Sequence, residues 1–132
     1  MNFLQRPDGR VAWWQNGETN PVTIVWVHGL PLDSRSWTHQ AQHFTAARNV
    51  FLDLRGYGSS TALGDHVSDV TQLYVDDLHA LVESLDLRDV VLVGFASGGH
   101  VTLRYAAQYP QRVQRLVTIN ASPRFRRGPD WP

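Results

Sequence analysis

Continuous apolar stretches recur along the chain and predict its strands. Each stretch is short, rich in valine, isoleucine and leucine, and shows little alternation with polar residues. Such runs are typical of strands that are buried on both faces of a sheet. We therefore expect four buried strands, at residues 22–29, 49–56, 89–95 and 113–122.

Between these runs, apolar residues recur three or four positions apart, which is the spacing of an amphipathic helix. The spacing predicts helices at residues 36–47, 68–87 and 98–110. Side-chain oxygens commonly cap the first turn, so we expect Ser34 or Ser36 to cap the first helix and Ser68 or Asp69 the second. The third helix should end before Pro110, because a proline ring cannot continue it.

Strands and helices that alternate at this spacing indicate βαβ units and a mostly parallel sheet with helices on both faces. The chain has 132 residues, which is the size of one domain. Before the first buried run, "RVAWWQNGE" alternates weakly and ends in Asn16-Gly17, a hairpin signal. We therefore predict an α/β architecture with its core at 1–122. Residues 123–132 break the periodicity, and we expect them to begin a crossing into another region of the fold.

The composition narrows the functions that are open to this chain. It has no cysteine, which excludes disulfides, thiolate catalysis and Cys-based metal sites and fits a cytoplasmic location. The formal net charge is zero and no apolar run has the length of a membrane helix, so we expect neither a nucleic-acid nor a membrane partner. His39 and His43 have the spacing of zinc ligands without a third ligand beside them, so we expect no metal and no cofactor.

The turn after the third buried run, Gly94-Phe95-Ala96-Ser97-Gly98, has the spacing of a strained strand–turn–helix corner. In such a corner a nucleophile sits at the tip, and the flanking glycines are needed because side chains would collide there. The backbone N–H of the next residue, here Ser97, points at the developing oxyanion. The tip itself is Ala96, whose methyl group cannot attack a substrate. Taken alone, the turn is equally well interpreted as an ordinary glycine-containing loop.

The loop after the first buried run reads "VWVHGLP", at residues 25–31. A His-Gly pair in this place supplies a second oxyanion donor in the same architecture, here the backbone N–H of Leu30. We assign a supporting role to His28 and Gly29, because a single histidine at a strand end is more often structural than catalytic.

A third motif, "DLRGYGSS" at residues 53–60, follows the second buried run and predicts a tight loop at the sheet edge where ligands bind. A pairing of Asp53 with Arg55 is one option there.

The motifs "HGLP", "DLRGYGSS" and "GFASGGH" occur in this order and at a matching spacing, and the chain thereby resembles the α/β-hydrolase family. The resemblance implies the N-terminal half of that fold, with an oxyanion hole at Leu30 and Ser97 and substrate contacts that include Phe95.

The final stretch, "VQRLVTINASPRFRRGPDWP", resembles one branch of the family, the bacterial pimeloyl-carrier-protein methyl ester carboxylesterases of biotin synthesis. In those enzymes a similar passage leads into a helical cap. The resemblance implies a small-molecule ester or an acyl-carrier-protein-bound ester as the substrate. It also motivates a docking patch for an acidic carrier protein at Arg124, Arg126 and Arg127, for which a solvated linker is the alternative.

The sequence departs from the family pattern at the catalytic residues. The family orders its triad as serine, acid and histidine, but position 96 is alanine. Downstream, the chain offers only His100, which we interpret as a helix-surface residue, and Asp130 near its end, so neither is assigned to the triad. We also do not assign the nucleophile to Ser97, because its side chain should point into the first helical turn.

We interpret Ala96 as an engineered replacement of the nucleophilic serine, because the glycines and the His-Gly loop around it are intact. The intact relative would hydrolyse an ester through an acyl-enzyme, whereas this chain would bind the ester without turnover. The alternatives are a natural non-catalytic hydrolase-like binding protein and, among enzymes, a lactonase or general esterase. A chemistry like that of epoxide hydrolases would need aspartate at position 96.

The last buried run would present an unpaired apolar edge if the sheet ended there. We therefore expect the remainder of the hydrolase fold, including the cap and the missing acid and histidine, to come from a longer chain or from a second chain.

Overall fold

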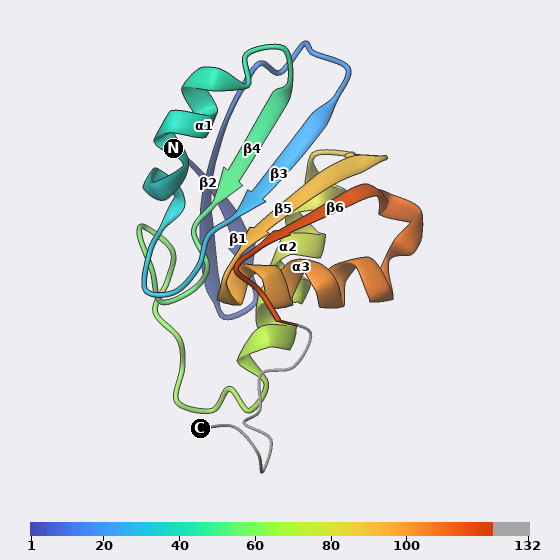
Figure 1. Ribbon diagram of the computed structural model, residues 1–132. Helices are drawn as coiled ribbons and strands as arrows, with labels where there is room; N and C mark the ends of the chain where they lie inside the picture. Colours follow the sequence, from blue (N-terminus) through green and yellow to red (C-terminus); the bar gives the residue numbers. More distant parts are fainter. Residues whose placement is uncertain (123–132) are drawn as a thin grey trace.

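The computed structural model describes residues 1–122, and the arginine cluster at 124–127 lies outside the described residues. The elements follow one another as β1 (Asn2–Arg6), β2 (Gly9–Asn16), β3 (Thr23–Val27), η1 (Ser34–Trp37), α1 (Thr38–His43), β4 (Arg48–Leu52), α2 (Val70–Ser84), β5 (Val90–Phe95), α3 (Ser97–Gln108), η2 (Pro110–Arg112) and β6 (Val113–Ile119). Figure 1 shows them in one layer of strands flanked by helices. No helix in this part of the chain is long and apolar enough to cross a membrane.

All strands form one six-stranded sheet in the order β1-β2-β4-β3-β5-β6. The pairs β4/β3, β3/β5 and β5/β6 are parallel, whereas β1/β2 and β2/β4 are antiparallel. The mostly parallel sheet is therefore confirmed, and each of the four expected strands is present in a shorter form. In a parallel sheet the carboxyl ends of the strands meet at one edge, and the loops that follow β3, β4 and β5 gather there.

The N-terminal hairpin differs from the prediction. The strand β2 ends at Asn16, but the next strand along the chain, β3, is not its neighbour, because β4 lies between them. The hairpin joins β1 to β2 instead, through the turn at Pro7 and Asp8. Asn16-Gly17 therefore marks a turn, with φ of +64° at Gly17, and not a hairpin between paired strands.

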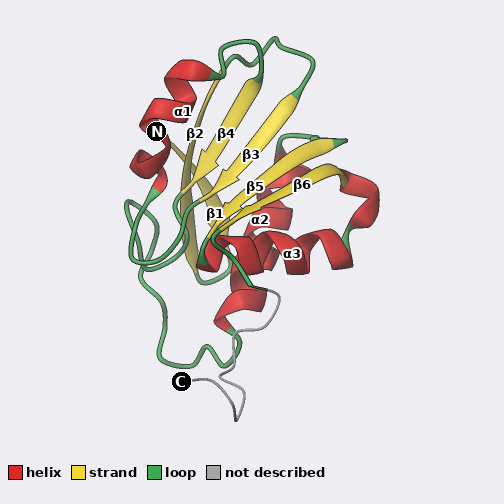
Figure 2. Cartoon of the chain, in the orientation of Figure 1, coloured by secondary structure: helices red, strands yellow, loops and turns green. Residues whose placement is uncertain are grey.

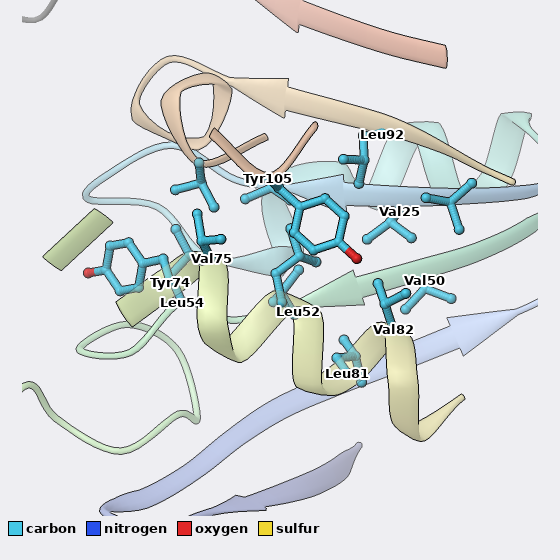
Figure 3. Close-up of a cluster of buried hydrophobic side chains, with 14 of the residues drawn as sticks. Val25, Val50, Leu52, Leu54, Tyr74, Val75, Leu81, Val82, Leu92 and Tyr105 are labelled. Atoms are coloured by element: carbon cyan, nitrogen blue, oxygen red, sulfur yellow. The ribbon is translucent and has the colours of Figure 1, made fainter. Parts of the chain in front are cut away.

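The two faces of the sheet carry different helices (Figure 2). On one face, α2 and α3 pack on alternate residues of the central strands, among them Val25, Leu52 and Leu92. Figure 3 shows this apolar cluster, in which Val75, Leu81 and Val82 of α2 and Tyr105 of α3 point toward the sheet. On the other face, Trp26 and Phe51 pack against Trp37 and Ala41 of η1 and α1. Because β3 is covered on both faces, all five of its residues are buried.

One of the two predicted helix caps is confirmed and the other is not. Asp69, one of the two residues predicted to cap the second helix, caps α2. Its carboxylate accepts a hydrogen bond from the Gln72 N–H at 3.0 Å. The first helical segment is capped by Asp33, whose carboxylate accepts from the Arg35 N–H at 2.9 Å. Ser34 is not the cap, because its buried hydroxyl accepts a hydrogen bond from the Trp14 indole N–H instead.

Candidate active site

The backbone between β5 and α3 makes a strained corner at Ala96. This residue has φ of 51° and ψ of −119°, a conformation that non-glycine residues rarely adopt. The Ala96 N–H donates to the Ile119 carbonyl at 2.8 Å, and the Ala96 carbonyl accepts from the Gly99 N–H at 2.9 Å. Strain of this kind costs about 1–3 kcal/mol and persists only when the surrounding structure fixes it. The corner is therefore held from both sides, by β6 and by the first turn of α3.

Glycine is required on both sides of the tip. A Cβ atom at Gly98 would press on the carbonyl oxygens of Val27 and His28, so α3 approaches the end of β3 closely only because that atom is missing. A Cβ atom at Gly94 would meet the Gly98 carbonyl and the Thr102 hydroxyl. These contacts are with backbone or with a buried side chain, and they explain the glycine spacing of the motif in steric terms.

The loop after β3 is fixed by a buried histidine. The His28 side chain is fully buried, and its Nε2 accepts a hydrogen bond from the Leu54 N–H at 2.9 Å. The other ring nitrogen, Nδ1, lies 3.1 Å from the Gly29 carbonyl and therefore carries the proton. Burial lowers the pKa of His28, and the Gly29 carbonyl and Asp53 only partly offset this, so the ring is neutral. His28 thus ties the loop at 28–30 to the loop that follows β4.

The two proposed oxyanion donors lie at the same corner, but one of them is engaged. The Leu30 N–H donates a hydrogen bond to the Ser97 hydroxyl oxygen at 2.8 Å. The Ser97 side chain therefore reaches across to the loop after β3, which differs from the expectation that it points into the first helical turn. Ser97 is the first residue of α3, where backbone N–H groups have no partner within the helix.

A cavity of about 650 Å³ opens beside this corner, between the N-terminal turns of α2 and α3. Its walls are mainly apolar and are formed by Leu30, Leu54, Val70, Tyr74, Val101 and Leu103. Four polar residues complete the lining, namely Ser97, Thr71, His100 and Arg104. Leu30 and Ser97 thus belong both to the corner and to the cavity wall, and their role in substrate binding stays a prediction.

The structure adds detail to two sequence predictions near this cavity. His100, interpreted as a helix-surface residue, lines the cavity. Phe95, expected to contact substrate, is not among the residues that line it, because its ring belongs with Val93 to the apolar cluster on the opposite face of the sheet. The residues from α2 were missed altogether, and only the spacing of Ser97, Val101 and Arg104 along one face of α3 could have signalled the cavity wall.

The loop at 53–60 is built by backbone and ion-pair contacts. Asp53 accepts hydrogen bonds from the Ser34 and Ser59 N–H groups, each at 2.9 Å. Arg55 does not pair with it but with Asp77 of α2, at 2.8 Å, and with Asp8 of the β1–β2 turn, at 2.7 Å. The prediction of an Asp53–Arg55 pair was therefore wrong, because backbone donors already occupy the carboxylate.

The rim and the wall of the cavity carry little net charge. Arg104 donates to both carboxylate oxygens of Asp69, at 2.9 Å each, so the guanidinium charge at the rim is balanced. Tyr74 donates its hydroxyl proton to the Arg55 carbonyl at 2.9 Å, and burial raises the pKa of this phenol to about 12. The cavity therefore combines mainly apolar walls with a rim at which the charge of Arg104 is balanced by Asp69.

A family model described as the alpha/beta hydrolase fold matches residues 22–132, which is most of the chain. This chain belongs to the α/β-hydrolase fold family. A pimeloyl-[acyl-carrier protein] methyl ester esterase of Cronobacter sakazakii is 33% identical to it over 121 residues, covering 91% of the chain and 44% of that protein. Epoxide hydrolase 4 of Mus musculus is 34% identical over 105 residues, covering 79% of the chain and 29% of that protein.

Among solved structures, an esterase from Exiguobacterium antarcticum superposes with a TM-score of 0.86 at 25% sequence identity. The superposition covers 98% of this chain and 49% of the esterase. The chain thus spans less than half the length of these family members. Their names describe different chemistries on one fold, so membership in the family does not by itself select a substrate.

Proposed function

We propose that the protein is a carboxylic-ester hydrolase of the serine type in which alanine occupies the nucleophile position, residue 96. The observation that carries this proposal is the backbone of Ala96, with φ of 51° and ψ of −119° at the tip of the corner. An alanine side chain gains nothing from such strain, whereas an exposed nucleophile depends on it. The chain as given is therefore expected to bind an ester and not to hydrolyse it.

With serine at position 96, the mechanism is acyl transfer to water. The serine oxygen attacks the ester carbonyl carbon, and the alcohol leaves as the tetrahedral intermediate collapses to an acyl-enzyme. The N–H groups of Leu30 and Ser97 are the candidate donors to the oxyanion. We assign the base that accepts the serine proton, and the acid that orients it, to the part of the hydrolase fold that follows the cap and lies outside this sequence, as the family order of serine, acid and histidine implies. His28 is not assigned as the base, because both of its ring nitrogens are engaged in the loop. Water then attacks the acyl carbonyl and releases the carboxylic acid.

The cavity supports an ester with an apolar acyl group. Its walls are mainly apolar, and the Asp69–Arg104 pair leaves its rim without net charge. The similarity to a pimeloyl-[acyl-carrier protein] methyl ester esterase makes a methyl ester on a carrier-bound acyl chain the first substrate to test. In this proposal Arg124, Arg126 and Arg127 would meet the acidic carrier protein. A lactone or a simple carboxylic ester is the alternative within the same chemistry.

A second candidate function is a binding protein without catalysis. The observation that favours it is the hydrogen bond from the Leu30 N–H to the Ser97 hydroxyl, which occupies one of the two proposed oxyanion donors. In this reading Ala96 is a natural residue and not an engineered one, and the corner holds a ligand without reacting.

We further propose that other residues of the hydrolase fold complete the sheet beside β6. Within residues 1–122 this strand pairs only with β5, and its apolar side chains Val117 and Ile119 are 45% and 40% exposed. Large exposed apolar residues on a strand edge are uncommon in finished sheets. The missing part, including the catalytic base, would come from the same polypeptide or from a second chain.

The direct test is ester hydrolysis by the full-length protein with Ala96→Ser, measured beside the unchanged protein. In a well-studied serine protease the loss of the nucleophile costs about 10⁶-fold in kcat, so we expect a gain of several orders of magnitude. Ala46→Ser, which adds a hydroxyl at an exposed position, is the matched control and should leave turnover at background. If Ala96→Ser binds esters and remains inactive on every one of them, the binding-protein alternative replaces the hydrolase.

The substrate is tested with the same Ala96→Ser protein. A carrier-protein methyl ester should give a higher kcat/KM than a short-chain p-nitrophenyl ester or an acyl homoserine lactone. Charge reversal at Arg124, Arg126 and Arg127 together should lower kcat/KM for the carrier-bound ester and leave the p-nitrophenyl ester unaffected. Equal effects on both esters would contradict the docking patch.

A further inference from the structure

The Ser97 hydroxyl engages one of the two backbone N–H groups that we propose as oxyanion donors. The Leu30 N–H, one of the two candidate oxyanion donors, has this hydroxyl oxygen as its acceptor at 2.8 Å. Both residues also line the cavity of about 650 Å³. A ligand oxygen that is to accept from the Leu30 N–H must therefore compete with an oxygen of the protein itself.

The donor of this contact is held in place by the backbone, whereas the acceptor is a side chain that can rotate. The donor is a main-chain N–H in a loop that His28 ties to Leu54. The acceptor is a short side chain on the first residue of α3, directly after the strained Ala96. Rotation about a single side-chain torsion of Ser97 breaks the contact, so the hydroxyl can be displaced without movement of the backbone.

We propose that the Ser97 hydroxyl is an internal ligand of the oxyanion hole, which holds the Leu30 N–H in the free protein and is displaced by the carbonyl oxygen of the ester. The inference rests on the proposed function, because it assigns Ser97 a side-chain role at the same site. Ser97 thereby reduces the affinity of the hole for neutral, weak acceptors. The cost of breaking this hydrogen bond is the same for every ligand, and a charged oxygen offsets it best, since a charge-assisted hydrogen bond is roughly twice as strong as a neutral one.

Removal of this hydroxyl should improve the site, which is the opposite of what a merely structural serine would do. A neutral hydrogen bond contributes about 0.5–1.5 kcal/mol net, equivalent to roughly a two- to tenfold change in affinity. In the Ala96→Ser background, Ser97→Ala should therefore raise kcat/KM for a p-nitrophenyl ester by about two- to tenfold. A structural role would instead lower stability and activity together.

A second measurement uses the full-length protein with Ala96 in place and does not depend on turnover. Butyrate is titrated into ¹⁵N-labelled protein, and the amide signals of Leu30 and Ser97 are followed by NMR. Ser97→Ala should tighten butyrate binding by about two- to tenfold and should speed hydrogen exchange of the Leu30 amide in the free protein. Ser84→Ala, which removes a hydroxyl from α2 that donates to the Leu81 carbonyl, is the matched control and should change neither.

The two proposals fail in different ways. If Ala96→Ser shows no turnover but Ser97→Ala tightens butyrate binding and exposes the Leu30 amide, the proposed hydrolase function fails and the inference about Ser97 stands. If Ala96→Ser is active and Ser97→Ala leaves kcat/KM, butyrate affinity and Leu30 exchange unchanged, the inference is overturned. A loss of activity in Ser97→Ala, or butyrate that shifts neither amide, overturns it as well.

Discussion

The two edge strands of the sheet both expose apolar side chains but differ in what fastens them. Phe3 of β1 is 42% exposed and lies beneath the guanidinium of Arg10, 4.1 Å from its ring centroid. At β1, Arg6 donates to Asp77 of α2 at 2.9 Å, and the neighbouring turn residue Asp8 pairs with Arg55 at 2.7 Å. At β6, the apolar side chains Val117 and Ile119 are exposed along the strand's second half. Natural sheets commonly protect their edge strands with charged side chains, whereas an exposed apolar edge strand tends to pair with another strand. The difference supports our proposal that the sheet continues beside β6 and not beside β1.

Asp77→Asn should have the largest effect, because it breaks the ion pairs that fasten the first edge. Asp77 and Arg55 are each 2% exposed, and Arg6 also donates to Asp77. Removing one partner of a buried pair leaves an uncompensated charge and costs about 3–5 kcal/mol. Urea unfolding of the full-length protein measures this loss. Asp86→Asn, at an exposed pair with Arg88, is the control and should cause no measurable change.

Val117→Asp tests the second edge. In the full-length protein the proposal places this residue under further structure, where an unpaired carboxylate should cost at least about 2 kcal/mol. Gln5→Asp on β1, an exposed position of the opposite edge, should stay within about 0.5 kcal/mol. Equal and small effects at both edges, measured by thermal or urea unfolding, would show that β6 is a true edge.

Gly98→Ala tests the corner that lies between the two edges. The added Cβ atom meets the carbonyl oxygens of Val27 and His28, and overpacking of this kind costs about 1–3 kcal/mol. Gly64→Ala is the control, because its Cβ atom meets only the His66 side chain, which can move. Denaturant midpoints for the pair measure the difference, and similar midpoints would mean that α3 does not need its close approach to β3.

A smaller effect, confined to acid pH, is expected from His28. Burial lowers its pKa in the folded protein from the ordinary 6.5, so the unfolded chain binds the proton more readily. The stability that His28 contributes is complete above pH 6.5 and is lost as the pH falls through the folded pKa. His28→Asn should therefore flatten the decline of unfolding free energy below pH 6.5. If the unfolding free energy falls as steeply below pH 6.5 in this variant as in the parent, groups other than His28 cause the decline.

The parts of the fold that depend on local patterns could be predicted from the sequence. Continuous apolar runs revealed β3, β4 and β5, and glycine spacing revealed the corner at Ala96. The strand β1 was missed because Asn2–Arg6 is mostly polar and pairs on one side only. Its anchor, Asp77, lies more than seventy residues away in the sequence, so no local pattern connects it with Arg6.

The site was predictable where it follows the backbone and not where it depends on side-chain direction. The positions of Leu30 and Ser97 follow from their motifs, but their hydrogen bond depends on a single rotamer of Ser97. The α2 wall of the cavity, with Val70 and Tyr74, arises only when helices distant in the sequence pack together. Phe95 packs on the face opposite the cavity because strand residues alternate between faces, and its contact with substrate stays a prediction.

The most direct test of the central claim is the site of covalent labelling by a fluorophosphonate, which forms an adduct only with an activated serine. The reagent is applied to the full-length protein with Ala96→Ser and to the unchanged protein, and the modified residue is located by tandem mass spectrometry. We expect one adduct, on the serine at position 96, and none in the protein with Ala96. An adduct on Ser97, or no adduct in the Ala96→Ser protein, would contradict the assignment of residue 96 as the nucleophile position.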